Sequence, residues 1–99
     1  MITTKQRAYL RGLANKEKAI FQIGKGGITE EILTELDIVL EKRELIKITV
    51  LETSFMSTRG ACEAVCEEIG AEPVQCIGNK FVIYRMARAK DNRKIQLPK

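Results

Sequence analysis

An amphipathic helical segment between two short strand-like runs is the feature that most constrains the fold. Apolar residues recur at helical spacing through residues 29–43, and most of the positions between them are acidic. The flanking runs, residues 19–23 and 45–50, are short and apolar, and the second is rich in β-branched side chains. This order predicts a β-α-β unit whose crossover is right-handed.

The segments on either side of this unit extend the alternation of helices and strands. Thr3, followed three residues later by Gln6, matches a capping box, and Gly70 is a typical helix stop. A Gly78-Asn79 pair between two short apolar runs is typical of a hairpin turn, so we expect those runs to pair antiparallel. The further elements that we expect are a helix over residues 4–14, a helix over residues 54–69, and strands over residues 74–77 and 81–84.

The order α-β-α-β-α-β-β predicts a fold of mixed α/β (α+β) class with one four-stranded mixed sheet. Right-handed crossovers place the second and third helices on the same face of that sheet. With 99 residues and 44% hydrophobic content, the chain suits one domain over residues 1–99 with one core. The basic tail, residues 86–99, has no periodic apolar pattern and is either mobile or docked through Ile95 and Leu97.

Composition disfavours several classes of protein. No apolar run approaches the roughly 20 residues of a membrane span, and the first residues lack the apolar region of a secretory signal. The chain has no histidine, so the commonest general base is missing and neither a Ser-His nor a Cys-His pair can form. We therefore expect a cytoplasmic, monomeric protein that is not an enzyme, needs no cofactor and does not bind a membrane.

The three cysteines form no disulfide framework by their number or spacing. Cys62 and Cys66 lie one helical turn apart, and Cys76 is the only other obvious sulfur donor, whereas a structural zinc site needs four ligands. Packing as small apolar residues is the favoured interpretation of these cysteines. A cysteine-metal regulator is a remote alternative.

Charge is distributed unevenly along the chain, whose net charge is +4. Residues 1–25 carry six basic side chains and one acidic, and residues 80–99 carry seven basic and one acidic. Residues 26–79 between them carry four basic and eleven acidic side chains. Two basic ends around an acidic middle predict one basic side, and favour a polyanion partner, provided that the ends meet in space.

A glycine-rich loop, Ile23-Gly24-Lys25-Gly26-Gly27-Ile28-Thr29, joins the first strand to the amphipathic helix. Amide groups in such a turn can converge on an anion, and a lysine at the tip adds a mobile positive charge. The simpler interpretation is a turn with no ligand, because the run matches neither common nucleotide-binding motif. Since Glu30 and Glu31 would repel an anion at the helix N-terminus, a phosphate is expected on the amides of Gly26 and Gly27 and on Lys25 instead.

Aromatic residues are scarce, so we expect contacts with a nucleic-acid backbone rather than base stacking. The five aromatic side chains are mostly assigned to the core: Tyr9, Phe21, Phe55, Phe81 and Tyr84.

Several motifs in this order resemble the CRM domain, which bacteria carry as the stand-alone YhbY family. The resemblance covers nearly the whole chain, including the closing Ile95-Gln96-Leu97-Pro98. The main matching runs are Lys5-Gln6-Arg7-Ala8-Tyr9-Leu10-Arg11, the glycine-rich loop, Glu44-Leu45-Ile46-Lys47-Ile48, and Val74-Gln75-Cys76-Ile77-Gly78-Asn79-Lys80-Phe81-Val82-Ile83-Tyr84-Arg85.

This resemblance implies an RNA-binding module with a fold like the C-terminal domain of translation initiation factor three. Bacterial members of the family associate with precursors of the large ribosomal subunit. The family's G-x-x-G loop maps onto residues 24–27 and is compared with the loop by which KH domains clamp a nucleic-acid backbone. The family's basic surface maps onto Lys5, Arg7, Arg11, Lys25, Lys47 and Arg85.

We expect an RNA-binding protein that binds ribosomal RNA in precursors of the large ribosomal subunit. The mechanism that we expect, contact through one continuous cationic face, requires the positive termini to fold back beside the glycine-rich loop. The alternative is a protein-interaction module that docks on a ribosomal protein or assembly GTPase through the acidic helix 29–43. The expected RNA-binding residues are Gly24, Lys25, Gly26, Gly27, Lys5, Arg7, Arg11, Lys18, Lys47, Lys80, Arg85 and Arg88.

Overall fold

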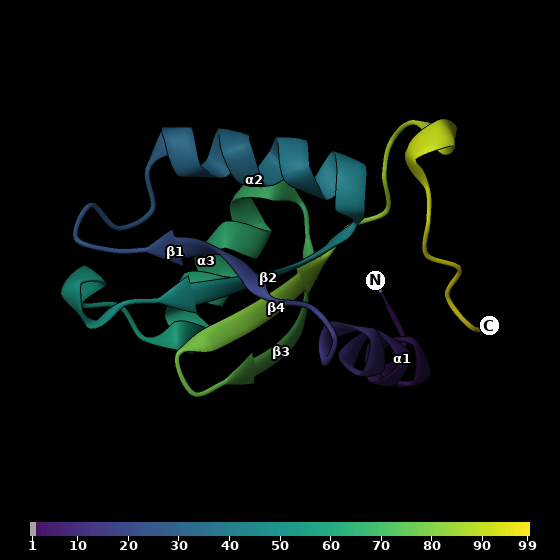
Figure 1. The fold of residues 1–99 in the computed structure, drawn as a ribbon, viewed down its shortest axis with the longest axis horizontal. Helices are drawn as coiled ribbons and strands as arrows, with labels where there is room; N and C mark the ends of the chain where they lie inside the picture. The colour runs from purple at the N-terminus through teal and green to yellow at the C-terminus, as the bar shows by residue number, and fades with distance from the viewer. Residues whose placement is uncertain (1) are drawn as a thin grey trace.

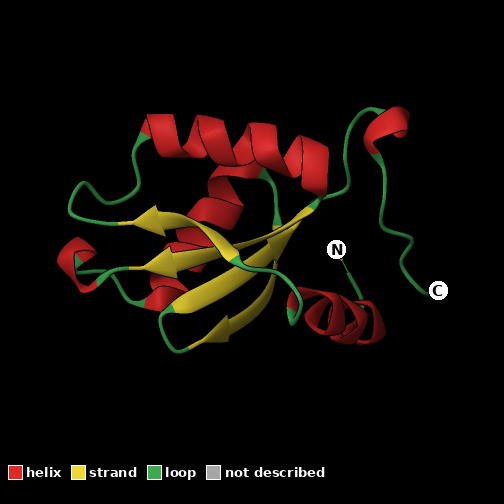
Figure 2. Ribbon diagram, in the orientation of Figure 1, coloured by secondary structure: helices red, strands yellow, loops and turns green. Residues whose placement is uncertain are grey.

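The fold is a four-stranded sheet with helices on both faces, and the computed structural model describes residues 2–99 (Figures 1 and 2). Three α-helices and two short 3₁₀ helices, η1 and η2, accompany the strands. In chain order the elements are α1 (Thr4–Ala14), β1 (Ala19–Ile23), α2 (Glu30–Arg43), β2 (Leu45–Val50), η1 (Glu52–Ser54), α3 (Thr58–Ile69), β3 (Glu72–Ile77), β4 (Lys80–Tyr84) and η2 (Lys90–Asn92).

The sheet has the order β1-β2-β4-β3 and is mixed, which confirms the predicted fold class. β1 pairs parallel with β2, while β4 pairs antiparallel with both β2 and β3. Gly78 has a φ of 57° and opens the two-residue turn between β3 and β4. Glycine takes this positive φ readily, as the first central position of a type II′ hairpin turn requires.

Two apolar clusters lie on opposite faces of the sheet. The larger one joins α2 and α3 to the inward-facing residues of the strands, including the fully buried Leu36, Ile48 and Phe81. The smaller one packs Leu10 and Ala14 of α1 against the other face. The placement of α2 and α3 on one face is as predicted, and α1 covers part of the opposite face (Figure 1).

Local signals fix most of the helix ends. Thr3 and Gln6 form the predicted capping box at the start of α1. The Thr29 hydroxyl accepts the Ile32 N–H at 3.2 Å and caps α2, so its first helical residue is Glu30. Gly70, with a φ of 67°, ends α3 as predicted.

The start of α3 differs from the prediction of a helix from residue 54. Glu52–Ser54 forms η1, and Phe55 then takes a left-handed conformation with a φ of 58°. A residue in that conformation cannot continue a right-handed helix, so α3 begins only after Ser57 caps the Gly60 N–H at 2.9 Å.

The tail, residues 86–99, docks on the body of the protein. Ile95 and Leu97 pack against the smaller apolar cluster. The carboxylate of Glu44, which is fully buried, accepts the backbone N–H groups of Ala87, Lys94 and Ile95 at 2.7 to 2.9 Å.

None of the helices between residues 2 and 99 is both long and apolar enough to cross a membrane.

Candidate nucleic-acid interface

The glycine-rich loop forms a tight turn at the end of β1. The Gly27 N–H donates to the Gly24 carbonyl at 2.8 Å, and Gly27 has a φ of 67°. Of the two amides expected to contact phosphate, that of Gly27 is therefore engaged inside the turn. The Gly26 amide makes no hydrogen bond within residues 2–99, and Lys25 at the tip is exposed.

Gly24 is held against the segment that follows β2. A Cβ at residue 24 would lie 3.4 Å from Leu51 Cδ1, and the Leu51 N–H donates to the Ile23 carbonyl at 2.9 Å. At residue 26 a Cβ would meet only Thr29 Cγ2, at 3.8 Å. The first glycine thus permits close packing of two loops, whereas residue 26 faces open space.

Three connections meet at this end of the sheet. Besides the glycine-rich loop they are the segment between β2 and α3 and the β3–β4 turn. The Val50 N–H donates to the Asn79 carbonyl at 2.7 Å, and the Thr58 hydroxyl donates to the Gly78 carbonyl at 2.8 Å. We call residues 24–29, 51–57 and 78–80 together the loop end (left in Figure 1).

Lys80 belongs to the loop end, and Lys47 lies close to it on the sheet face that α1 leaves open. Both side chains line a hollow of about 110 Å³, together with Gln75, Ile77 and Asn15. Two cations and two amides around one hollow can hold a phosphate and hydrogen-bond a sugar or base. The structure therefore brings together Lys47 and Lys80, which the sequence places 33 residues apart.

Arg7 lies farther along the same face, where its Nε donates to the Pro73 carbonyl at 3.0 Å. Arg7 and Arg59 line a groove of about 280 Å³ along β3, and this groove shares Gln75 with the hollow beside Lys80. Sequence reasoning did not select Arg59. The only feature of the sequence that could have indicated Arg59 is that it is a single basic residue in the first turn of α3.

The basic termini do not fold back beside the glycine-rich loop, contrary to the expectation. α1 precedes the N-terminal end of β1, whereas the loop follows its C-terminal end, about 16 Å away for a five-residue strand. The tail likewise follows β4 at the end where β2 begins, because the Arg85 N–H donates to the Glu44 carbonyl at 2.9 Å. Figure 1 shows the loop and both termini at opposite ends of the long axis, whose extent is 39 Å.

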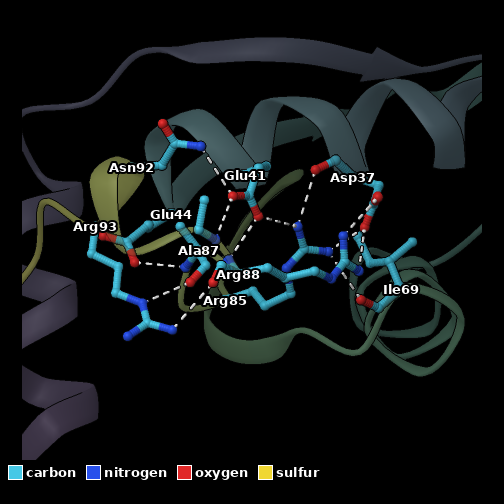
Figure 3. A network of polar contacts seen from close by, with 10 residues as sticks. Asp37, Glu41, Glu44, Ile69, Arg85, Ala87, Arg88, Asn92 and Arg93 are labelled. Atoms are coloured by element: carbon cyan, nitrogen blue, oxygen red, sulfur yellow. Dashed lines mark hydrogen bonds and ion pairs between the residues drawn. The ribbon is translucent and has the colours of Figure 1, made fainter.

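Arg85 is a structural residue rather than a free cation. Its side chain is only 10% exposed, and its guanidinium pairs with the Asp37 carboxylate and donates to the carbonyls of Asp37 and Ile69 (Figure 3). Arg88 pairs with the same carboxylate at 3.2 Å. Hydrogen bonds from Arg88 and Arg85 lower the pKa of Asp37. The expected role of Arg85 in RNA contact conflicts with this arrangement.

The other two predicted cations of the N-terminal region have different surroundings. Lys5 donates from Nζ to the Lys99 carbonyl at 3.3 Å, at the end of the molecule farthest from the loop. Lys18 is exposed just before β1, and Arg11 is half-buried in the last turn of α1.

Phe55 is the surface feature that sequence reasoning assigned wrongly. It was expected in the core, but it is 95% exposed, at the loop end. Little in the sequence indicates that Phe55 is exposed, because a lone aromatic residue before a helix resembles a core residue of that helix. The backbone of Phe55 takes a left-handed conformation after η1, which the sequence pattern does not indicate.

The three cysteines are close together, but they give no support to the metal alternative. Cys62 and Cys66 are buried in the larger apolar cluster, as predicted, while Cys76 is exposed. The hydrogen bond with Cys66 and burial both raise the pKa of Cys62, which keeps it protonated. Among residues 2–99 there is no group of three or more side chains suited to hold a metal ion.

Comparison with known proteins finds a matching family model and similar proteins that are named as RNA-binding. The profile of the CRS1 / YhbY (CRM) domain matches residues 2–85. The chain is 38% identical to the probable RNA-binding protein YqeI of Bacillus subtilis, over 99% of this chain and all of that protein. It is 35% identical to an RNA-binding protein of Haemophilus influenzae, over 99% of this chain and 96% of that one.

A solved structure shares the fold. It is the solution structure of SAV1595 from Staphylococcus aureus, which is 46% identical to this chain with a TM-score of 0.79. The match covers 99% of this chain and all of the other.

Proposed function

Because the chain belongs to the CRS1 / YhbY (CRM) domain family, we propose that it is an RNA-binding protein whose target is ribosomal RNA in precursors of the large ribosomal subunit. RNA binding is supported by the names of two relatives that align over nearly the whole chain. The ribosomal target rests on the likeness of its motifs to a family whose bacterial members associate with such precursors. The protein acts by binding, in the cytoplasm, and not by catalysis.

The observation that carries the proposal is the chemistry of the loop end. Lys25 is exposed beside the free amide of Gly26, and Lys80 belongs to the same end of the sheet. A phosphate held by Lys25 and this amide receives one charge-assisted and one backbone hydrogen bond. Lys47 and Lys80 then hold a second phosphate of the same strand in the hollow on the open sheet face.

The test is the double variant Lys25→Asp with Gly26→Asp. Both positions face solvent and residue 26 has room for a side chain, so thermal stability is expected to stay almost unchanged. Two carboxylates at the phosphate position should abolish retention of ribosomal RNA. The measurement is binding of a large-subunit RNA fragment by filter retention, with the melting temperature of each protein measured alongside.

The matched control is Lys90→Asp with Gln96→Asp in the tail. These residues are exposed, and the pair lowers the net charge by the same amount as the loop variant, but away from the loop end. It should bind RNA nearly as well as the original chain. Equal loss in both double variants would mean that only net charge matters, and unaltered binding in the loop variant would rule out the loop.

A second candidate function has one observation in its favour. Between α2 and α3 lies a groove of about 530 Å³ that combines the acidic Glu30 and Glu68 with apolar Leu33 and Ile69, and the Asp37–Arg88 ion pair also lines it. Such a groove suits a basic segment of a ribosomal protein or assembly GTPase. Association with large-subunit precursors that survives both nuclease treatment and high salt would favour this protein partner over RNA.

A further inference from the structure

Phe55 combines two unusual properties. Its side chain is 95% exposed, more than any other large apolar residue of the described chain. Its backbone has a φ of 58° and a ψ of 20°, a left-handed conformation that bulky residues rarely adopt. Asparagine or glycine would fit this backbone better, and neither would expose an aromatic ring to water. Both the left-handed backbone and the exposed ring of Phe55 are therefore unfavourable for folding.

The segment that carries Phe55 is held in place by its attachment to the glycine-rich loop and by hydrogen bonds of its own. On one side Leu51 pairs with Ile23 and packs against Gly24 of the glycine-rich loop. Within the segment, the Phe55 N–H donates to the Glu52 carbonyl at 3.0 Å, and the Ser54 hydroxyl accepts the Met56 N–H at 3.2 Å. The ring is thus presented by a short ordered turn. Figure 1 shows that this segment, which follows β2, lies next to the loop that follows β1 and contains Lys25.

We propose that Phe55 is a base-stacking residue, which makes unpaired RNA the ligand of the loop end. An exposed aromatic face beside cations is the arrangement by which proteins bind single strands: cations hold the backbone and the ring stacks on a base. In a duplex the bases are already stacked and paired, so the ring would find no partner. This inference rests on the proposed function and names the class of RNA that it involves.

The surroundings of the ring favour RNA over an apolar protein partner. Lys25 and Lys80 are both exposed at the same end. Glu52 is the exposed acidic residue in the segment of Phe55, and Glu30 and Glu31 follow the loop at the start of α2. The side of the loop end away from α2 is therefore the one that can approach a strand, and a protein partner is an outcome that the test distinguishes.

The first experiment uses tryptophan as a reporter. The chain has no tryptophan, so Phe55→Trp introduces the only one, and Ile38→Trp on the exposed face of α2 is the matched control. Each protein is titrated with a 12-nucleotide RNA, either single-stranded or paired with its complement. Stacking should quench the fluorescence of Phe55→Trp strongly with the single strand and little with the duplex, and should leave Ile38→Trp unchanged.

The second experiment separates binding from stability. Phe55→Asn suits the left-handed backbone, so its melting temperature should be equal to or above that of the original chain. Its affinity for the single-stranded RNA should nevertheless fall about 5- to 150-fold, the range for loss of one stacked base. Phe55→Tyr keeps the ring and should bind within about twofold of the original chain.

The outcomes distinguish this inference from the function on which it rests. If Phe55→Asn binds unpaired RNA as well as the original chain while the loop variant has lost binding, stacking is overturned and RNA binding stands. If neither variant loses affinity, the RNA binds elsewhere on the chain and the loop end is overturned as its site, and if the original chain itself binds no RNA, the proposed function is overturned as well. Equal quenching of Phe55→Trp by duplex, or quenching by a ribosomal protein but not by RNA, would also overturn the inference.

Discussion

Glu44 is the residue whose position is least expected from its chemistry. A carboxylate at a helix C-terminus faces the negative end of the helix dipole, and this one is also fully buried, with a φ of 65°. Burial opposes its ionisation, but three backbone N–H donors and the nearby Arg93 outweigh burial and lower the pKa of Glu44. The tail forms no strand, so its amides have no acceptors in a sheet. The Glu44 carboxylate accepts the hydrogen bonds of three of these amides instead.

Glu44→Ala is expected to lower the free energy of unfolding by about 2–3 kcal/mol, because three amides lose a charged acceptor. Glu44→Gly loses the same acceptor but accommodates the left-handed backbone, so it should be about 1 kcal/mol less destabilised than the alanine variant. Urea denaturation of the two variants measures both effects. Stability within about 0.5 kcal/mol of the original chain in both would contradict the role given to this carboxylate.

At the scale of elements, α2 and the tail act as one unit. The Glu41 carboxylate accepts the backbone N–H groups of Ala89 and Arg88 at 3.0 and 2.8 Å, and the Asn92 side-chain amide at 3.1 Å (Figure 3). These hydrogen bonds, that of Ala89 first, lower the pKa of Glu41 to about 2 from 4.5. A basic tail is thus held by acidic residues of the helix, and part of its charge is neutralised there.

The Glu41 anchor of the tail should be lost in acid. Since the pKa of Glu41 is lowered by folding, its contribution to stability is complete above about pH 4.5 and disappears as the pH falls toward 2. The amide chemical shifts of residues 88 and 89, followed by NMR, should change with a midpoint near pH 2, while shifts of β4 change less. In Glu41→Gln this titration should vanish, and a midpoint near 4.5 in the original chain would contradict the anchoring.

At the scale of the molecule, the two basic regions are separate. The loop end lies at one end of the 39 Å axis and the termini at the other. Arg85 and Arg88 of the terminal region are paired with Asp37, whereas Lys25 and Lys80 have no acidic partner among the described residues. The cations of the loop end are therefore free to meet a polyanion, whereas two arginines of the terminal region are already neutralised by Asp37.

Salt dependence can locate the binding end. For a single strand, log K falls with log salt by about 0.7 per phosphate neutralised. Lys25→Ala and Lys80→Ala should each reduce this slope by about 0.7, while Lys5→Ala and Lys90→Ala should leave it unchanged. The slopes are obtained from the RNA affinity measured at potassium chloride concentrations from about 50 to about 300 mM. A reduced slope for Lys5→Ala would place the RNA at the termini.

The candidate site could be predicted only in part, and the missed residues show why. Gly24, Lys25 and Gly26 are contiguous, so a local motif was enough to find them. Arg85 belongs to a matching motif but is paired with Asp37, a residue 48 positions earlier, which no local pattern reveals. Phe55 is exposed and follows a 3₁₀ turn with a left-handed backbone, which no local pattern in the sequence indicates.

The sequence by itself determined the elements and their order. Periodicity, caps such as Thr3 with Gln6 and turn residues such as Gly78 act over a few positions, so a local pattern specifies them. Only the tertiary structure decided which charges are free and which end of the sheet they occupy. That outcome depends on contacts between distant segments, where a carboxylate such as Asp37 or Glu44 either neutralises a cation or binds a tail.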